Sequence, residues 1–406
     1  MKIKIFYLSI ILFVFMPFVR AIEIESNNAI LYNLNNNEIL YEKNSEQTIK
    51  IASLTKIMTA IVAIENIEDI NKQVTITYDM LKGLREENAL VLGFKVGDVV
   101  TYNDLLYATL LPSAADAANA LAISTSGSIS NFVELMNNKA NELGLKNTLF
   151  TNTTGIDFND NHSTVKDVAV ILKYALNNEI FKKIYTSKTY TTTNGISMIH
   201  SLEKTIKRYN LGIDYIKGAK TGYTDLAGLC LSSITDYNEI NYLLVTCGAN
   251  PKLELPYNIV DSDTIYKYYF ENYHYRNILT KNKIVKQIKN KYSDKKIDLI
   301  SNINYSIYML DEDYNNLTYE YVGLEEIDIF TKEKVIGKYN IKLNGKILKS
   351  IDIYKPKKID FSIINFIFSN FCIIITVLIV MIILLRKIVH LKKYSRRKKW
   401  ERMDLH

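Results

Sequence analysis

The apolar run near the C-terminus, Phe361–Leu385, limits the possible architectures most, because it contains no charged residue. About 20 residues of helix are enough to cross the hydrocarbon layer of a membrane. Basic residues follow at once: Arg386, Lys387, Lys392, Lys393, Arg396, Arg397, Lys398 and Lys399. Such a flank marks the cytoplasmic side, and a buried core helix would not explain it. We therefore expect a transmembrane helix at residues 361–385, a basic cytoplasmic tail at residues 386–406, and the body of the chain outside the cell membrane.

The N-terminal segment has the pattern of a secretion signal. Lys2 and Lys4 precede the apolar run Ile5–Phe18, and Val19-Arg20-Ala21 offers small enough residues for cleavage. We expect residues 1–21 to be a signal peptide that is cleaved after Ala21. The alternative is an uncleaved anchor, and in both cases the following residues are exported.

The charge and the histidines exclude two classes of function. The net charge is +7, but much of the basic excess lies in the C-terminal tail, so the body is close to neutral. It shows no basic face interleaved with aromatic residues, and we expect no nucleic-acid partner. The five histidines are scattered without metal-ligand spacing, so we expect no metal and no other cofactor.

Three cysteines are few for an exported protein. Cys372 lies in the transmembrane run, whereas Cys230 and Cys247 lie on two predicted strands. In a tight hairpin Cys230 would face about Val245, which places the two sulfurs diagonally. We favour free thiols, although the sequence leaves a disulfide between them open.

The order of strand and helix patterns predicts an α+β protein. Apolar runs at Ala29–Leu34 and Glu38–Glu42 predict one hairpin. Gly228–Thr235 and Ile240–Gly248 predict a second hairpin. Helices are predicted at Asp116–Ile123, Ser130–Gly144, Thr164–Asn177 and Asp263–Leu279. From residue 281 to 356 the pattern has a period of two. We expect a small β-rich domain there, since alternating Ile, Leu and Tyr argue against a disordered linker.

Ser53 and Lys56 are the candidate catalytic pair. They stand near the start of Ile49–Asn66, where apolar residues recur at helical spacing. A spacing of three puts both side chains on one helical face. A serine hydroxyl attacks poorly until a base removes its proton, and a lysine can do so if burial or a neighbouring cation lowers its pKa. A helix N-terminus would add backbone N–H groups that stabilise an anion.

The spacing alone is not specific, because an incidental serine with a solvated lysine gives the same pattern. It also occurs at Ser163/Lys166, Ser201/Lys204, Ser293/Lys296 and Ser395/Lys398. What favours Ser53 is its context: Ser113 follows a helix break at Pro112, and Lys220-Thr221-Gly222 opens a predicted strand. Lys220 offers a fixed cation for a carboxylate, and Gly222 leaves room for a substrate against the strand. By itself, the last motif also fits a plain strand entry with a glycine kink.

In this order the three pieces resemble the penicillin-binding and serine β-lactamase-like superfamily, and within it the low-molecular-weight D-alanyl-D-alanine carboxypeptidases, peptidase family S11. The resemblance covers roughly residues 24–280 and rests on Ala52–Thr59, Leu111–Ala118, His162-Ser163-Thr164 and Lys220–Asp225. It implies a catalytic domain at residues 22–280 with an antiparallel sheet flanked by helices. The active site would lie between the sheet and a helical lobe. The small β-rich domain, the export signal and the C-terminal anchor match the layout of this family.

The resemblance also implies roles in removing the terminal D-alanine from a peptidoglycan stem pentapeptide. Ser53 would be acylated, Lys56 would take its proton, and Ser113 would relay a proton to the leaving amine. Lys220 would keep Lys56 partly deprotonated and, with Thr221, would hold the substrate carboxylate. Gly222 would line the substrate, and the backbone N–H groups of Ser53 and Tyr223 would form the oxyanion hole. Penicillin and other β-lactams would be covalent inhibitors.

One departure stands out at the second motif. The family usually has S-x-N there, whereas this chain has Ala115 at the third position. The missing amide would normally bind the substrate peptide and steady the catalytic lysine. Activity could be lower, specificity altered, or the role taken by Asp116 or Asn119. Members of the family usually have an asparagine-containing segment before K-T-G. In this chain Asn210 is the candidate for that asparagine.

These residues leave four functions open. The leading one is a penicillin-sensitive serine D-Ala-D-Ala carboxypeptidase. A wall-associated scaffold that binds penicillin but has lost turnover is the alternative that Ala115 motivates. An endopeptidase or transpeptidase differs only in pocket shape. A β-lactamase ranks last, because the chain has no E-x-x-L-N segment that could supply a deacylating glutamate.

Overall fold

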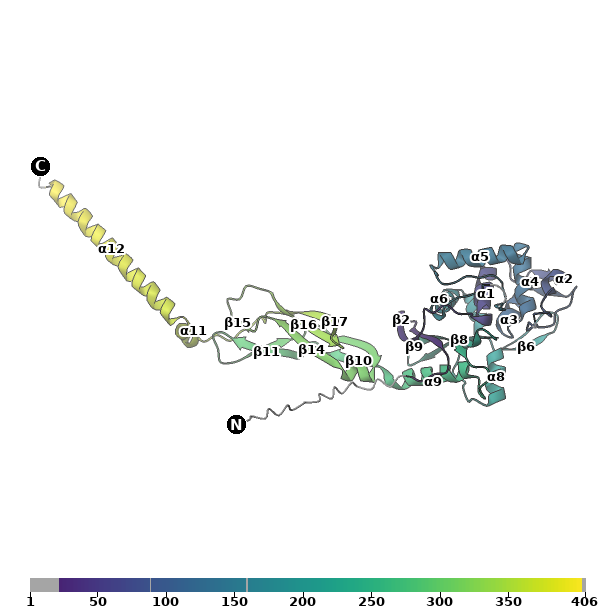
Figure 1. Cartoon of the computed structure of the whole chain (residues 1–406). Coiled ribbons are helices and arrows are strands. Elements are labelled where there is room, and N and C mark those ends of the chain that lie inside the picture. Colours follow the sequence, from purple (N-terminus) through teal and green to yellow (C-terminus); the bar gives the residue numbers. More distant parts are fainter. Residues whose placement is uncertain (1–21, 88, 158–159, 404–406) are drawn as a thin grey trace, which may run out of the picture. The chain divides into compact units, whose positions relative to one another are not determined.

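The computed structural model describes residues 22–87, 89–157 and 160–403. The expected signal peptide, residues 1–21, and the end of the expected tail, residues 404–406, lie outside the described residues. The chain divides into two compact units after Glu271, which precedes the expected boundary at residue 280 (Figure 1).

The first unit is built on a five-stranded antiparallel sheet with the strand order β2-β1-β9-β8-β7. These strands are β1 (Asn28–Asn33), β2 (Glu38–Lys43), β7 (Gly218–Thr224), β8 (Gly228–Tyr237) and β9 (Ile240–Ala249). The two hairpins expected from the sequence, β1–β2 and β8–β9, are confirmed. Strand β7 lies at the edge of the sheet, so one side of its backbone is free to meet a ligand.

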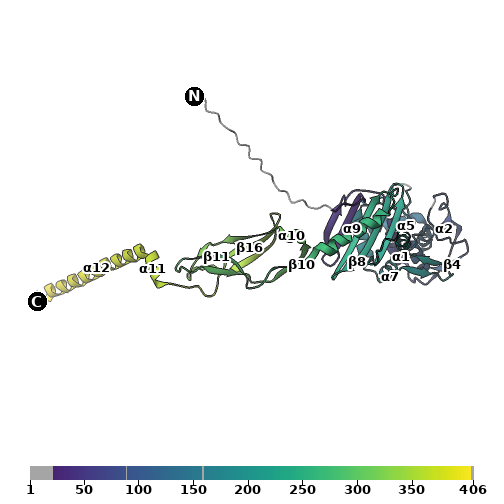
Figure 2. The same ribbon diagram turned by 90° about the horizontal axis from the view of Figure 1, so that it is seen from below.

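Helices cover both faces of this sheet. Since neighbouring residues of a strand point to opposite faces, adjacent residues of β8 contact different helices. Ser232 of β8 bonds the Tyr185 hydroxyl of the helical lobe at 2.9 Å, whereas the next residue, Ser233, bonds the Tyr266 hydroxyl of α9 (Tyr257–Asn272) at 2.9 Å. Figure 2 shows α9 lying across the strands. The expected fold, an antiparallel sheet between helices, is confirmed.

The helical lobe is organised around α1 (Thr55–Asn66), which is buried on all sides from Thr55 to Ile64. The other helices of this unit are α2 (Tyr78–Leu81), α3 (Tyr102–Leu110), α4 (Ala115–Ser126), α5 (Ile129–Glu142), α6 (Val165–Ala175), α7 (Glu179–Tyr185) and α8 (Ser201–Tyr209). Two short ribbons complete the lobe, β3 (Gln73–Thr75) with β4 (Val99–Thr101), and β5 (Thr189–Thr191) with β6 (Ser197–Ile199). A large hydrophobic core joins the lobe to the sheet.

The predicted helix at Asp263–Leu279 is wrong in its second half. Helix α9 ends at Asn272, and Tyr273–Leu279 forms strand β10. This strand pairs with β13 (Tyr305–Leu310) of the second unit. The pairing partner lies about 30 residues away in the sequence, so a helical pattern read locally cannot reveal it.

The second unit confirms the expected β-rich region. Besides β10 and β13 it contains β11 (Ile284–Asn290), β12 (Ile297–Ile300), α10 (Asp311–Asn315), β14 (Leu317–Gly323), β15 (Glu326–Ile327), β16 (Val335–Leu343) and β17 (Lys346–Tyr354). Two small clusters of buried residues, one around Leu299 and one around Ile341, hold its sheets together.

The C-terminal apolar run forms two helices, α11 (Ile363–Ser369) and α12 (Phe371–Met403), separated at Asn370. Within the described part of the chain, Phe371–Arg396 is the helix that is long and apolar enough to cross a membrane. It begins later than the expected span, residues 361–385, because the chain breaks at Asn370, whose side-chain amide donates to the Phe366 carbonyl.

The cysteines of the sheet are free thiols, as favoured from the sequence. The register differs from the one assumed, however. Val245 of β9 faces Ser232, because the hairpin turn pairs Tyr237 with Ile240, and the ladder shifts only beyond this pair, between Leu229 and Leu231.

Candidate active site

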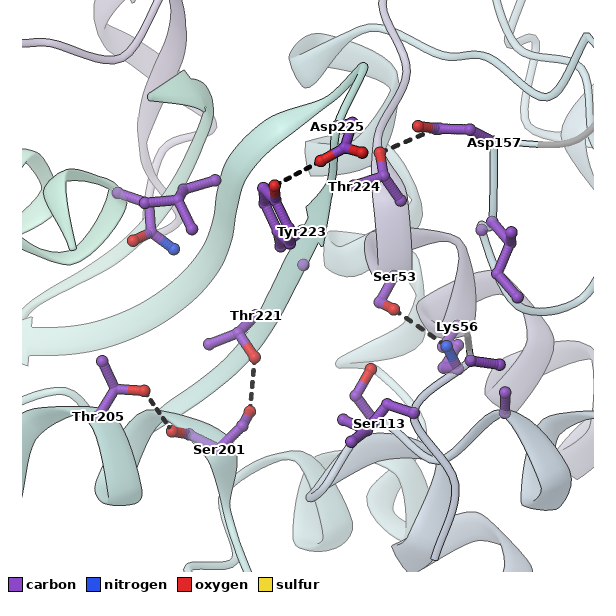
Figure 3. Close-up of a pocket in the computed structure, with 18 of the residues that line it drawn as sticks. Ser53, Lys56, Ser113, Asp157, Ser201, Thr205, Thr221, Tyr223, Thr224 and Asp225 are labelled. Carbon is purple, nitrogen blue, oxygen red and sulfur yellow. Dashed lines mark hydrogen bonds between the residues drawn. The ribbon is translucent and has the colours of Figure 1, made fainter. Parts of the chain in front are cut away.

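A pocket of about 610 Å³ in the first unit brings together most of the residues that the sequence singles out. It lies between the edge strand β7, the start of α1 and the connection from α3 to α4 (Figure 3). Its lining includes Ser53, Lys56, Ser113, Thr221, Gly222 and Tyr223. The three sequence motifs therefore meet in one cavity.

Ser53 lies in a short 3-10 turn, Ala52–Leu54, immediately before α1. Lys56 is in the first turn of α1, and its Nζ donates a hydrogen bond to Ser53 Oγ at 3.0 Å. Ala52 has a φ of 48°, a left-handed conformation that costs an alanine roughly 1 kcal/mol or more. Such a conformation persists only where the surroundings enforce it.

Two glycines provide the close packing around this turn. A Cβ atom on Gly155 would lie 1.9 Å from the Ala52 carbonyl oxygen, and Gly155 itself has a φ of 80°. A Cβ on Gly222 of β7 would lie 3.1 Å from the Ser53 backbone nitrogen. The turn that presents Ser53 is thus clamped between the K-T-G strand and the loop that carries Gly155.

Lys56 is 2 % exposed and has two described hydrogen bonds, to Ser53 Oγ at 3.0 Å and to the Thr154 carbonyl at 2.7 Å. Burial lowers the pKa of Lys56 to about 7, although the nearby charge of Asp116 acts in the opposite direction. Burial disfavours the charged form of an amine. Near neutral pH a large fraction of Lys56 is therefore a neutral amine that can accept the proton of Ser53.

Lys220 is fully buried, and it is not among the described residues that line the pocket. Its Nζ donates to the Thr221 carbonyl at 2.8 Å. Burial lowers the pKa of Lys220 well below its ordinary value, and the nearby charge of Lys56 lowers it further. Lys220 is thus a buried residue of β7 that lies close enough to Lys56 for their charges to interact.

Ser113 sits between α3 and α4 with a φ of 68°. This conformation turns the chain sharply after Pro112. In Figure 3 the hydroxyl of Ser113 lies on the pocket side and is directed toward Ser53. The left-handed conformation is an uncommon one for a serine, and such outliers cluster at functional sites.

Ser201 is a pocket residue that sequence reasoning missed. It is the first residue of α8, and its hydroxyl lies 2.5 Å from Thr221 Oγ1. The preceding His200 fixes this helix to β7, because Nε2 lies 2.8 Å from the Ala219 carbonyl while Nδ1 accepts from the Leu202 N–H. Burial lowers the pKa of His200 to about 4, so the ring is neutral and Nε2–H is the donor. The sequence pointed to Ser201 only as one of several Ser-x-x-Lys pairs.

Asn210, the sequence candidate before K-T-G, lies elsewhere. It ends α8 in a left-handed conformation with a φ of 50°, is exposed, and is not among the described lining residues. Asparagine tolerates this conformation better than most residues. Its position at a helix C-terminus accounts for the residue type without a catalytic role.

The two neighbours proposed to replace the missing amide at Ala115 are engaged elsewhere. Asp116 accepts backbone N–H bonds from Leu92, Gly93 and Phe94 at 3.0–3.2 Å. Asn119 Oδ1 accepts from Thr153 Oγ1 at 2.7 Å. Neither side chain has a described hydrogen bond to Lys56.

Within the described ranges, no group of three or more His, Cys, Asp or Glu side chains could hold a metal ion. The side chains that line the pocket include hydroxyls, an amine and carboxylates.

Comparisons with known proteins agree with this geometry. The sequence model of a family described as D-alanyl-D-alanine carboxypeptidase (Peptidase_S11) matches residues 16–251. The chain is 29% identical over 335 residues to D-alanyl-D-alanine carboxypeptidase DacF of Bacillus subtilis, covering 80% of this chain and 83% of DacF. It is 29% identical over 234 residues to a D-alanyl-D-alanine endopeptidase of Pseudomonas aeruginosa, covering 56% of this chain and 72% of that one.

A solved structure of penicillin binding protein 5 from Haemophilus influenzae superimposes with a TM-score of 0.59 at 26% identity. The match covers 82% of this chain and 96% of that protein.

Proposed function

Because this chain belongs to the D-alanyl-D-alanine carboxypeptidase family, we propose that it removes the terminal D-alanine of peptidoglycan stem pentapeptides through an acyl-enzyme on Ser53. The observation that carries this proposal is the 3.0 Å hydrogen bond from buried Lys56 to Ser53 Oγ. A hydroxyl beside an amine of lowered pKa is an activated nucleophile.

In the first half-reaction, the neutral Lys56 amine accepts the Ser53 proton while Oγ bonds to the carbonyl carbon of the penultimate D-alanine. The backbone N–H groups of Ser53 and Tyr223 stabilise the resulting oxyanion. The carbon–nitrogen bond then breaks, and Ser113 gives its proton to the departing amine of D-alanine while it takes the proton held by the Lys56 ammonium, which returns Lys56 to the neutral form. In the second half-reaction, Lys56 takes a proton from water as the water oxygen bonds to the ester carbon. The ester bond to Oγ then breaks, and Lys56 returns the proton to Ser53 Oγ.

The carboxylate of the terminal D-alanine binds beside Thr221, near the middle of β7. Support comes from the hydroxyls of Thr221 and Ser201, which lie 2.5 Å apart on the pocket wall. Hydroxyl donors of this kind can hold a carboxylate. Lys220 contributes through its electrostatic field, since it is fully buried and is not among the described lining residues.

A β-lactam acylates the same serine. Oγ bonds to the lactam carbonyl carbon, the ring carbon–nitrogen bond breaks, and the amine stays tethered to the acyl group instead of leaving.

The apolar helix Phe371–Arg396 and the basic residues after Leu385 support attachment to the cell membrane by one C-terminal pass, with the catalytic unit on the wall side.

The test is incubation of the detergent-solubilised full chain with a stem pentapeptide, followed by measurement of released D-alanine. Wild type is expected to release D-alanine, and the Ser53→Ala variant to release none. Equal release by the two proteins would contradict the proposal.

Ala115 motivates one second candidate, a wall-associated scaffold that binds penicillin without turnover. Labelling of Ser53 by a fluorescent penicillin, without D-alanine release, would favour it. Cleavage of cross-linked peptides in preference to pentapeptides would instead indicate an endopeptidase.

A further inference from the structure

A tight turn at Asn152–Gly155 lies next to the catalytic lysine, and one side chain holds it closed. Asn152 Oδ1 accepts hydrogen bonds from the Thr154 N–H at 3.1 Å and the Gly155 N–H at 2.7 Å. Asn152 Nδ2 donates to the Ile156 carbonyl at 3.1 Å. Asparagine closes turns in this way because its short side chain substitutes for a backbone partner.

The turn is fixed against the helical lobe on two further sides. The Thr153 carbonyl accepts from Thr59 Oγ1 of α1 at 2.7 Å, and the Thr153 hydroxyl donates to Asn119 of α4 at 2.7 Å. Gly155 packs directly on the Ala52 carbonyl. The position of the Thr154 carbonyl is therefore set by its neighbours on both sides.

The Thr154 carbonyl accepts from Lys56 Nζ at 2.7 Å. The other described partner of Lys56, Ser53 Oγ, becomes an ester oxygen once the enzyme is acylated, and an ester oxygen is a weaker acceptor. Ala115 has no side-chain acceptor to offer. During the second half-reaction the Thr154 carbonyl is thus the described acceptor that can still orient the amine.

We propose that Asn152 is a positioning residue for Lys56: it holds the turn that directs the Thr154 carbonyl at the amine through acylation and deacylation. This rests on the proposed function of Ser53 and Lys56. Asn152 touches neither the serine nor the lysine by a described hydrogen bond, so it acts through the turn alone.

The test compares Asn152→Ala with a matched control, Asn137→Ala, in the full chain. The Asn137 side chain also donates and accepts hydrogen bonds with the backbone: it donates to the Phe150 carbonyl at 2.8 Å and accepts from the Phe150 N–H at 2.9 Å. It does so upstream of the turn that meets Lys56. Each variant removes a side-chain amide that both donates and accepts hydrogen bonds with the backbone. Only Asn152→Ala releases the turn that positions the Thr154 carbonyl.

Acylation by a fluorescent penicillin and hydrolysis of the acyl-enzyme are measured from pH 5 to 9, together with the melting temperature. We expect Asn152→Ala to slow both steps by about tenfold to a hundredfold. In Asn152→Ala the acid limb, the fall of the rate toward low pH, should move to higher pH. Water that reaches the Lys56 amine relieves the burial that lowers the pKa of Lys56. Asn152→Asp retains an acceptor oxygen and should stay within a few-fold of wild type above the limb. Asn137→Ala should lower the melting temperature and leave the acid limb unchanged.

If Asn152→Ala and Asn137→Ala show the same acid limb and the same rates, Asn152 has only a structural role and the proposal is overturned. Absence of labelling in wild type would overturn the proposed function as well, so the two failures can be told apart.

Discussion

Ser53/Lys56 and Ser163/Lys166 have the same spacing within the first unit, but the start of α1 and the start of α6 place them in different surroundings. Lys56 is 2 % exposed, and burial lowers its pKa to about 7. Lys166 is at the surface and forms an ion pair with Glu46. That pairing raises the pKa of Lys166, which keeps it protonated at neutral pH.

The serines differ as well. Ser53 lies in the pocket on a turn with a left-handed residue before it. Ser163 is fully buried beside Thr148 Oγ1, at 2.7 Å, and its backbone is bridged to Ile49. Burial of the amine together with access for the hydroxyl, and not the spacing of the two residues, therefore distinguishes the proposed nucleophile from Ser163.

The largest expected effect is loss of the nucleophile. Ser53→Ala should reduce penicillin labelling and D-alanine release by about 10³-fold or more, since a catalytic unit fails when its nucleophile is removed. Ser163→Ala should keep the rate within a few-fold of wild type. Both rates are measured at pH 8. A comparable loss in Ser163→Ala would contradict the conclusion that only Ser53 has the surroundings of a nucleophile.

Replacing the base should come next. Lys56→Ala should lower the acylation rate by roughly 10³-fold, and Lys56→Arg should not rescue it, because a guanidinium does not release its proton in proteins. Lys166→Ala should leave the rate unchanged. Stopped-flow acylation measures all three, and near-wild-type turnover of Lys56→Arg would show that Lys56 is not the base.

The packing of the Ser53 turn can be tested with two glycines that share a left-handed conformation. A Cβ on Gly155 would lie 1.9 Å from the Ala52 carbonyl, whereas a Cβ on Gly144 meets nothing within 4 Å. Gly144→Ala should cost about 1 kcal/mol of unfolding free energy from backbone strain alone. Gly155→Ala should cost about 2–4 kcal/mol because it adds a clash.

Chemical denaturation of both variants measures the difference. Equal costs would mean that the turn is not clamped by Gly155.

The pH dependence should be the gentlest effect. Because the folded pKa of Lys56 is about 7, the acylation rate should fall about tenfold per pH unit below pH 7 and level off above it. The folded pKa is also below that of the unfolded chain, so the folded state binds fewer protons between these values. The unfolding free energy contributed by Lys56 should therefore rise with pH between about 7 and about 10.5.

Lys56→Met should remove that rise, which thermal unfolding from pH 7 to 9 measures. An unaltered pH dependence in this variant would assign the rise to other groups.

The sequence was sufficient to predict the sheet hairpins and the β-rich region, because these depend on local periodicity. The three motifs of the pocket were predicted from their order and their resemblance to a known family, since the spacing alone is not specific. It could not predict contacts between distant segments. Thr154 meets Lys56 across 98 residues, and Ser201 meets Thr221 through the packing of α8 on β7. Nothing local in the sequence shows what the turn at Asn152–Gly155 faces.

The wrong choices have the same origin. Asn210 is a candidate by residue type and position before K-T-G, whereas the residue of α8 that reaches the pocket near its start is Ser201. The continuation of α9 to Leu279 was read from local pattern, whereas pairing with β13 decides the conformation of Tyr273–Leu279.

The most direct test of the account is titration of the Lys56 side-chain amine by NMR in the unacylated protein, with Lys56→Met used to assign the signal. We expect an apparent pKa of about 7 for Lys56 and a raised pKa for Lys166. A Lys56 amine that stays protonated up to its ordinary pKa of about 10.4 would contradict the claim that burial makes it the base.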